Sequence, residues 1–356
     1  MVYNKKKLII VIAVCVAAFF FYRHYRNRLN DNLGAVSEFA VGCVSTDTQG
    51  NHSTLYFFDD NLELIDKKKI NVGSLSSEYS VPLRKGQEIY IPNTGERERE
   101  GISMVYFNGK TGEAKYYQDS EGFGMMDTIF NDKEKIYYTT NLNFDCAIYE
   151  LNFSGEKENS ASINNTLIGN GGVLGNEIFL ITHSIASGDQ EEDGTRIVFY
   201  NEGLEKLREY NTEEFVHRGP SIVYDDKIYF MSSNAGEEDN CIYSVDRNGN
   251  FEKIPLPYLV YRIEPISEGI LIAGGDENQG GYILLKKDGE KIIFNMKETS
   301  LLQMKWHKNH LFTLDRDESK DETVIRKYNL RNNEMNLVAE KIVEISSKRQ
   351  FARSIF

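Results

Sequence analysis

The chain has 356 residues, enough for two ordinary domains, but all-β architectures often use this length as a single domain. Its hydrophobic content of 40% and its six Pro exclude a disordered or collagen-like chain, and its 21 Tyr and 20 Phe are typical of β-strands. The formal net charge is −13, and because residues 1–37 are basic, the remainder is more acidic still. Such a body repels phosphate backbones, which argues against nucleic-acid binding and favours a basic partner or a metal cation.

Residues 8–22 form an apolar segment without a charge, with Lys5–Lys7 before it and Arg23, Arg26 and Arg28 after it. As a helix this segment would cover roughly 22 Å, short of the ~30 Å hydrocarbon core of a bilayer. Flanking Lys, Arg and Tyr side chains could extend its reach by snorkelling to the headgroups. A cleaved signal peptide is the alternative, although no A-x-A cleavage site follows the apolar run. The pattern favours an uncleaved transmembrane anchor.

The basic residues on the two sides of this anchor nearly balance, so their count alone does not set its orientation. We expect a single-pass protein of the cell membrane with its N-terminus inside and its body outside, since a short N-terminal anchor behaves like an uncleaved export signal. The alternative leaves the body in the cytoplasm. The expected organisation is a basic N-terminus (1–7), a transmembrane anchor (8–22), a linker (23–37) and one β-domain (38–356).

The β-domain repeats itself about every forty to fifty residues, which indicates a repeat architecture. Seven copies of a strand that ends in a polar turn begin at Leu55, Val105, Ile148, Ile197, Ile242, Ile283 and Ile325. Asn, Asp and Gly recur in these turns because hairpins need positive φ there. An apolar strand precedes each copy, beginning at Phe39, Ile89, Ile136, Ile178, Ile228, Ile270 and Leu311. With one further strand before and one after, each unit holds four strands, as a propeller blade does.

Only six inner strands lie between the first and last units, so the tail 349–356 is expected to supply the seventh inner strand and to complete blade 1. Such a closure removes an exposed strand edge. The predicted fold class is all-β, a seven-bladed β-propeller preceded by a single N-terminal transmembrane helix. Cys43, Cys146 and Cys241 show neither a disulfide framework nor a zinc pattern, and we expect them to be small apolar strand residues.

Units such as 227–233 followed by 241–249 resemble those of bacterial TolB-like propellers within the WD-repeat-like superfamily. The resemblance covers roughly residues 38–356, but the chain has neither the Trp-Asp signature of WD-repeats nor the kelch double-Gly pattern. What it implies is a membrane-anchored propeller with an interaction role, and no particular activity.

In five of the units, the segment that joins the second strand to the third is acid-rich, and in a propeller these segments share one face with the channel mouth. We call ten acids that we expect in these segments the acidic crown: Glu96, Asp189, Glu191, Asp193, Glu237, Glu238, Asp239, Asp276, Asp315 and Asp317. The functional interpretation is an electrostatic docking surface for a basic protein segment or a cation. The alternative is solvated charge that keeps the protein soluble and protects strand edges.

Within the crown, Asp189, Glu191, Asp193 and Gly194 have the spacing of a calcium loop, in which alternating carboxylates converge on one hard cation. Glu191 departs from the short side chain usual there, and Tyr200 stands where a bidentate Glu is needed. Calcium is the one cofactor that the sequence leaves open.

Four residues point to a ligand at the channel mouth: His217, Arg218, Tyr261 and Arg262. Guanidinium groups beside aromatic rings suit a carboxylate, a sugar or a peptide terminus. The alternative is that both Arg side chains bond to carbonyl groups at blade edges or to the crown.

No G-x-S-x-G, P-loop or H-E-x-x-H motif occurs in the chain, which lowers the expectation of an enzyme without excluding one. We therefore expect a membrane-tethered, extracytoplasmic propeller that binds a protein or peptide, or acts as a scaffold, through the acidic crown. The alternative is an extracytoplasmic enzyme, of the hydrolase or lyase type, or a carbohydrate-binding domain with its site at the channel mouth.

Overall fold

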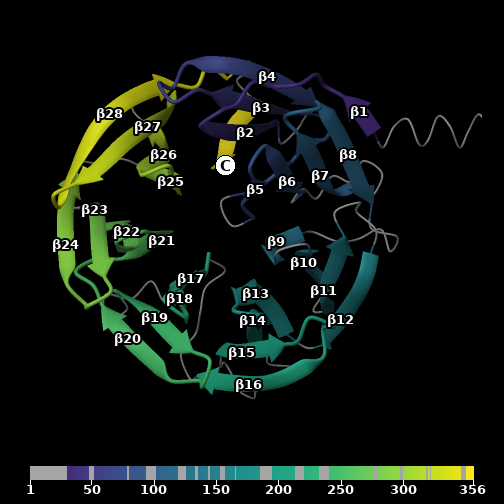
Figure 1. Cartoon of the computed structure of the whole chain (residues 1–356), viewed down its shortest axis with the longest axis vertical. Helices are drawn as coiled ribbons and strands as arrows, with labels where there is room; N and C mark the ends of the chain where they lie inside the picture. The colour runs from purple at the N-terminus through teal and green to yellow at the C-terminus, as the bar shows by residue number, and fades with distance from the viewer. Residues whose placement is uncertain are drawn as a thin grey trace, which may run out of the picture.

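The fold is that of a ring of seven antiparallel sheets around a central axis, seen in a computed structural model (Figure 1). The structure describes residues 30–47, 52–77, 80–93, 102–118, 126–132, 135–142, 145–152, 157–164, 166–184, 195–212, 220–231, 240–275, 280–296, 300–317, 320, 322–345 and 350–356. The predicted seven-bladed, all-β propeller is confirmed. Within these ranges no helix is long and apolar enough to cross a membrane. The expected transmembrane segment, 8–22, lies outside them.

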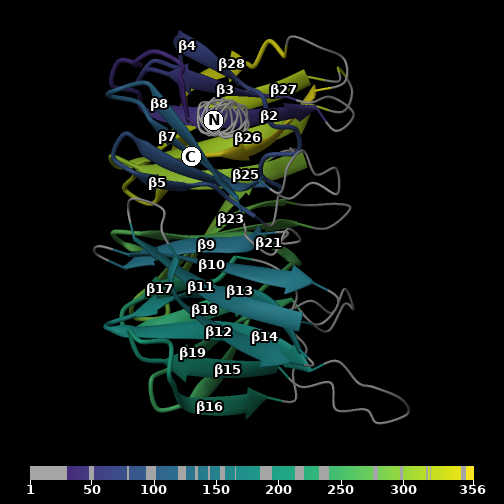
Figure 2. The same ribbon diagram turned by 90° about the vertical axis from the view of Figure 1, so that its right-hand side faces the viewer.

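Each blade has four strands between the axis and the rim, in sequence order except in blade 1, whose innermost strand is the last of the chain. Figure 2 shows the strands crossing the thickness of the ring. Blade 1 contains β29 (Gln350–Ile355), β2 (Val41–Asp47), β3 (Ser53–Phe58) and β4 (Leu64–Ile70). Blade 2 contains β5 (Leu83–Lys85), β6 (Glu88–Pro92), β7 (Ile102–Asn108) and β8 (Glu113–Gln118), with β1 (Asn30–Asn32) outside β8. Blade 3 contains β9 (Met126–Asp132), β10 (Lys135–Leu142), β11 (Asp145–Asn152) and β12 (Lys157–Asn164).

The remaining four blades follow the same order. Blade 4 contains β13 (Thr166–Leu174), β14 (Glu177–Ser184), β15 (Thr195–Tyr200) and β16 (Lys206–Thr212). Blade 5 contains β17 (Ile222–Tyr224), β18 (Lys227–Met231), β19 (Cys241–Asp246) and β20 (Phe251–Pro255). Blade 6 contains β21 (Val260–Ile266), β22 (Gly269–Gly275), β23 (Gly280–Lys286) and β24 (Lys291–Met296). Blade 7 contains β25 (Ser300–His307), β26 (His310–Asp317), β27 (Glu322–Arg331) and β28 (Glu334–Ile342).

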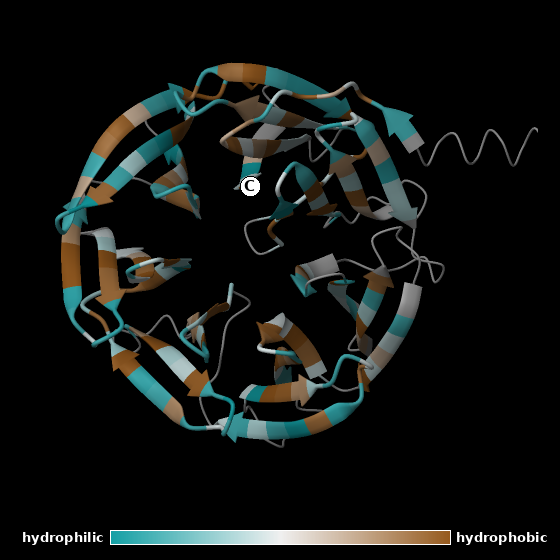
Figure 3. Ribbon diagram, viewed as in Figure 1, coloured by the Kyte–Doolittle hydropathy of each residue, from teal (hydrophilic) through white to brown (hydrophobic). Residues whose placement is uncertain are grey.

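The core is divided into seven apolar clusters, one between each pair of neighbouring blades. Strand β14 shows why, because Ile178 and Leu180 pack toward blade 3 whereas Phe179 and Ile181 pack toward blade 5. A strand buried on both faces reads as a continuous apolar run rather than as an alternation. Hydrophobic residues accordingly fill the strands of every blade, and hydrophilic ones gather at the turns (Figure 3). Cys43, Cys146 and Cys241 are buried within these strands and form no disulfide with one another.

Blade 1 is completed by the C-terminal strand, as the sequence predicts: β29 pairs antiparallel with β2. Beyond β29, Phe356 and Gly42 exchange two backbone hydrogen bonds of 2.9 Å. The ring of Phe356 is buried and lies edge-on to Phe39 and Phe57, with centroid distances of 6.0 and 5.9 Å. A Cβ atom at Gly42 would stand 2.3 Å from the Phe356 ring, so only glycine fits beside it. The two ends of the propeller are thereby joined through one sheet and one apolar cluster.

The segment expected to be a linker contributes to the ring, because β1 adds a fifth strand to the rim of blade 2. Beyond β1, Leu33 N donates to Gly112 O at 2.8 Å and Val36 N donates to Gly109 O at 2.7 Å. Val36 is buried in the cluster between blades 1 and 2, with Leu33 packed against it. From residue 30 onward, the chain therefore belongs to the propeller.

The turns between the third and fourth strands of blades 1 and 4 have the same design. In each, one side chain, Asp59 or Asn201, accepts hydrogen bonds of 2.8–3.0 Å from the backbone N–H groups two and four residues later. Positive φ falls on Leu62 (63°) and Leu204 (60°) rather than on the expected Asn, Asp or Gly. Both leucines are buried in inter-blade clusters, and that burial compensates for the strain of the left-handed backbone.

Candidate functional site

The two faces of the ring differ in the connections that they carry. We call the face at which second strands end and third strands begin the loop face, and the opposite face, with the short turns, the turn face. Connections 185–194, 232–239 and 276–279 attach at strand ends on the loop face, and they hold four, three and two acids without a Lys or Arg. The topology therefore brings the acid-rich connections of three consecutive blades to one face.

Most residues of the acidic crown lie outside the described residues, namely Glu96, Asp189, Glu191, Asp193, Glu237, Glu238, Asp239 and Asp276. The same holds for His217 and Arg218 of the channel mouth. The calcium candidate formed by Asp189, Glu191 and Asp193 is among them. Within the described residues, no group of three or more His, Cys, Asp or Glu is placed to hold a metal ion.

Asp315 belongs to strand β26 rather than to a loop, and its side chain is buried. It accepts a hydrogen bond of 2.5 Å from Thr313 Oγ1 and forms an ion pair of 3.1 Å with Arg326. Asp315 therefore supports the sheet of blade 7 instead of facing a partner. Asp317, at the end of β26, forms an ion pair of 3.1 Å with Lys320.

A cavity of about 270 Å³, which we call the channel, lies between the inner strands β5, β9, β13, β17, β21 and β25. Its wall is partly apolar, with Phe130, Ile222 and Met304 among the lining residues. Polar groups that line it connect one blade to the next. Glu264 Oε1 forms an ion pair of 3.2 Å with Lys305. It also accepts a hydrogen bond of 3.0 Å from the backbone N–H of Trp306. Such a wall combines apolar surface with a few fixed polar groups, as ligand pockets do.

Arg262 lines this channel, as a residue of the inner strand β21. Its Nε donates to Leu302 O of blade 7 at 3.0 Å, and its Nη1 donates to Tyr261 O at 2.7 Å. The Arg262 guanidinium therefore donates hydrogen bonds to carbonyl groups, as the alternative interpretation expects, and it also lines the channel. Tyr261 is exposed, and its hydroxyl donates to Gly275 O at 2.9 Å, at the loop-face end of β22.

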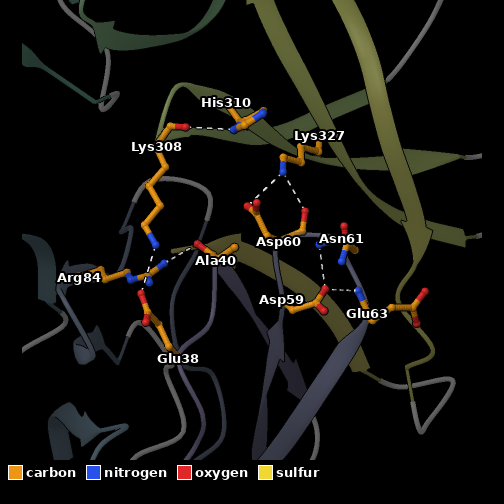
Figure 4. Close-up of polar contacts among 10 residues, drawn as sticks. All are labelled: Glu38, Ala40, Asp59, Asp60, Asn61, Glu63, Arg84, Lys308, His310 and Lys327. Atoms are coloured by element: carbon orange, nitrogen blue, oxygen red, sulfur yellow. Dashed lines mark hydrogen bonds and ion pairs between the residues drawn. The ribbon is translucent and has the colours of Figure 1, made fainter.

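On the turn face, a polar junction holds blades 7, 1 and 2 together (Figure 4). Arg84 Nη1 and Nη2 donate to Ala40 O at 2.7 Å and to Phe39 O at 2.8 Å, and its guanidinium lies 4.0 Å from the centroid of the Phe39 ring. Lys308 pairs with Glu38 at 3.1 Å across the seam between blades 7 and 1. Arg84 is the part of this junction that fixes the chain just before β2.

Lys327 and Asp60 make the second contact of this junction, also across the seam between blades 7 and 1. Lys327 Nζ lies 3.0 Å from Asp60 Oδ1 and donates to Asp60 O at 2.8 Å. The hydrogen bond from Lys327 lowers the pKa of the Asp60 carboxyl below its usual value. Because the charged groups of the junction bond to one another, we interpret the junction as a structural feature that stabilises the ring.

Sequence reasoning missed Arg84 and Lys327, but the repeat carried a signal for one of them. The third residue of the repeated strand is apolar at Phe57, Phe107, Phe199 and Leu285, whereas it is Glu150 in blade 3 and Lys327 in blade 7. A charge at a buried strand position needs a partner. Glu150 has Lys135 at 2.7 Å, and Lys327 has Asp60. Arg84, in the short inner strand β5, left no comparable signal.

Comparisons with known proteins identify the fold alone. No protein-family model matches the sequence, and no curated protein matches it. Among solved structures, the β-propeller domain of the Trilobed protease from Pyrococcus furiosus is 11% identical with a TM-score of 0.58, over 87% of this chain and 97% of that one. The acylaminoacyl peptidase of Pyrococcus horikoshii is 13% identical with a TM-score of 0.58, over 85% of this chain and 51% of that one.

A third similar structure has different chemistry. The apocarotenoid oxygenase of Synechocystis is 7% identical with a TM-score of 0.57, over 88% of this chain and 92% of that one. Peptidases and an oxygenase on one architecture show that the fold does not set the function. The protease domain is described as having an open velcro topology, whereas β29 pairs with β2 here. The chain is a seven-bladed β-propeller similar to these proteins in fold.

Proposed function

We propose that this chain is a membrane-tethered binding domain, which holds a basic protein or peptide segment on its loop face. The apolar segment 8–22 serves as the tether, and the propeller lies on the outer side of the cell membrane. The single observation that supports this function most strongly is that the acid-rich connections of blades 4, 5 and 6 attach at the same face. Neighbouring acids on a rigid ring add their fields, which attracts and orients a basic segment.

The rigidity of the ring supports the same proposal. Its two ends are joined in blade 1, and the polar junction on the turn face connects blades 7, 1 and 2 through Arg84, Lys308 and Lys327. When a partner binds to a preorganised platform, less of the interaction free energy is lost to ordering the platform. The turn face carries this network of internal ion pairs, and we assign it to stability.

Charge reversal on the full chain in nanodiscs tests this function. The variant Glu237→Lys, Glu238→Lys, Asp239→Lys changes the loop-face connection of blade 5. Its matched control reverses three exposed acids of turn-face turns, Glu202, Glu268 and Glu334. We expect the first variant to weaken binding of a fluorescent Lys-rich peptide by at least about tenfold, or ~1.4 kcal/mol, and the control to leave it within about twofold. Equal losses in both variants would contradict the assignment to the loop face.

A separate experiment tests on which side of the membrane the propeller lies. Protease added to intact cells should degrade the propeller if it lies outside the cell. Complete protection would show that the propeller lies on the inner side of the membrane. This outcome does not depend on which partner binds.

A second candidate function follows from Arg262. Because this guanidinium stands at the channel and belongs to an inner strand, the channel offers a place for a small carboxylate or a sugar. Under this function, Arg262→Lys should weaken binding of the small ligand, while the triple reversal at Glu237, Glu238 and Asp239 should leave it unchanged. A screen of organic acids and sugars by thermal shift, repeated on Arg262→Lys, separates the two functions.

A further inference from the structure

The point at which the chain joins the ring is fixed on the rim of blade 2. Asn30, Asp31 and Asn32 pair with β8, and the hydroxyl of Tyr116 in β8 donates to Asp31 Oδ2 at 2.8 Å. The backbone bonds of Leu33 and the burial of Val36 continue this attachment. The chain therefore enters the propeller at its outer edge, and not at either face.

The proposed tether can reach only a short way from this edge. Residues 23–29, seven in number, connect the apolar segment 8–22 to Asn30. However they are folded, seven residues span at most about 25 Å. With 8–22 in a bilayer, the rim of blade 2 must stay within this distance of the headgroups.

A run of lysines lies beside the entry point, on the outer strand of blade 1. Strand β4 contains Lys67, Lys68 and Lys69, and Lys68 Nζ would lie 3.4 Å from a Cβ atom placed on Gly34. Lys68 pairs with Asp66 at 2.8 Å, whereas Lys67 and Lys69 are exposed. Among the outer strands that the structure describes, β4 is the one with three consecutive lysines. A positive strip on a body with an excess of acids is a local feature that attracts an anionic partner.

Exposed aliphatic side chains accompany these lysines. Leu64 begins β4 and is 47% exposed, and β28, the outer strand of blade 7, exposes Leu337 (52%), Val338 (49%) and Ile342 (47%). Figure 1 shows β28, β4 and β8 following one another along the rim. Lys341 of β28 pairs with Glu63 of blade 1 at 2.9 Å, which joins the two edges. Of the acids nearby, Glu63 has this lysine as its partner, and Glu340 lies 3.2 Å from Arg326.

We infer that this edge of the ring rests against anionic lipid headgroups. The tether-side rim consists of Leu64, Lys67, Lys69, Leu337, Val338 and Ile342. Lysines bind the headgroup charge while the aliphatic side chains enter the interfacial layer, as on membrane-surface helices. The inference rests on the proposed tether and adds an orientation to it. The rim faces the membrane and the ring axis lies parallel to the membrane plane, so the acid-rich loop face points along that plane and stays accessible to a partner.

A quenching experiment on the full chain in nanodiscs tests this orientation. In a Cys15→Ala background the other cysteines are buried, so a single surface cysteine can carry a fluorophore. One label goes on Asn336→Cys in β28 and the other on Asn248→Cys, an exposed turn position of blade 5, which lies three blades from blade 1 and from its strand β4. Nitroxide-headgroup lipid is the quencher, in discs with or without phosphatidylglycerol. Position 336 is informative because it lies two blades from the entry of the tether.

We expect quenching at position 336 and not at 248 in anionic discs. Lys67→Glu/Lys69→Glu should lower the docking equilibrium constant at least about 25-fold, because each lysine near an anionic surface contributes about fivefold. The matched control, Lys206→Glu/Lys253→Glu on the outer strands of blades 4 and 5, should leave the quenching unchanged.

Equal quenching at both labels, or no effect of Lys67→Glu/Lys69→Glu, would overturn the inference while the chain stays in the discs. Loss of the chain from the discs at high salt would instead refute the tether itself. The two failures are therefore distinguishable.

Discussion

Truncation of one buried ring tests whether the C-terminal closure holds the propeller together. Phe356→Ala removes a ring that is 2% exposed and packs between Phe39 and Phe57. Replacing a fully buried Phe by Ala costs about 3–5 kcal/mol, and the two edge-on ring contacts place this site in the middle or upper part of that range. We therefore expect the free energy of unfolding to fall by about 4 kcal/mol, with the backbone bonds to Gly42 still in place.

The assay is a urea titration followed by fluorescence of Trp306, the only Trp of the chain, which lies in β25 beside the closing blade. Phe251→Ala is the control, because Phe251 is only partly buried. We expect this control to cost about 1 kcal/mol. A Phe356→Ala variant that unfolds at the same urea concentration as wild type, or loses no more than the control, would refute the closure argument. Deletion of 350–356 should then also be harmless, whereas our reasoning predicts that it prevents folding.

Three further predictions concern single side chains. Arg84→Lys keeps the charge but loses the paired bonds to two carbonyls, so the free energy of unfolding should fall by about 2 kcal/mol in thermal melts. Asn201→Ala should lower the free energy of unfolding by about 1 kcal/mol. Asn201→Asp should keep most of that stability, because it keeps a side-chain oxygen that accepts hydrogen bonds from the two backbone N–H groups. Burial lowers the pKa of His307, so the unfolded chain binds its proton more readily and stability should fall as the pH decreases from about 7 to about 5. His307→Gln should flatten that decrease in a pH series of melts, and an unchanged slope would reject the reasoning.

The blades could be predicted from the sequence because their middle strands are buried on both sides. Ile178–Ile181 is one such run, and its apolar character comes from contact with two neighbouring blades at once. Closure by the tail followed from a count of inner strands, and the structure confirms it. Strand β1 could not be predicted, because Asn30–Asn32 has no strand propensity of its own and is held by pairing with β8.

The site was harder to predict, because a side chain's partner depends on register. Asp315 reads as part of an acidic loop, yet it lies in β26 beside Arg326 of the next strand, and only the pairing of Thr313 with Arg326 brings the two together. Arg262 could be placed at the channel because it precedes the apolar residues of an inner strand. Its bond to Leu302 O depends on how blade 7 packs against blade 6, which no local pattern records.

Photo-crosslinking in living cells tests whether the loop face holds a basic segment of a partner. A photoreactive amino acid replaces Glu238, in the loop-face connection between β18 and β19, or Asn248, on the turn face of the same blade. We expect a discrete crosslinked partner protein from position 238, joined to the propeller through a Lys- or Arg-rich segment of the partner. We expect no crosslinked protein from position 248. Crosslinks from position 248 alone, or the same products from both positions, would contradict this expectation.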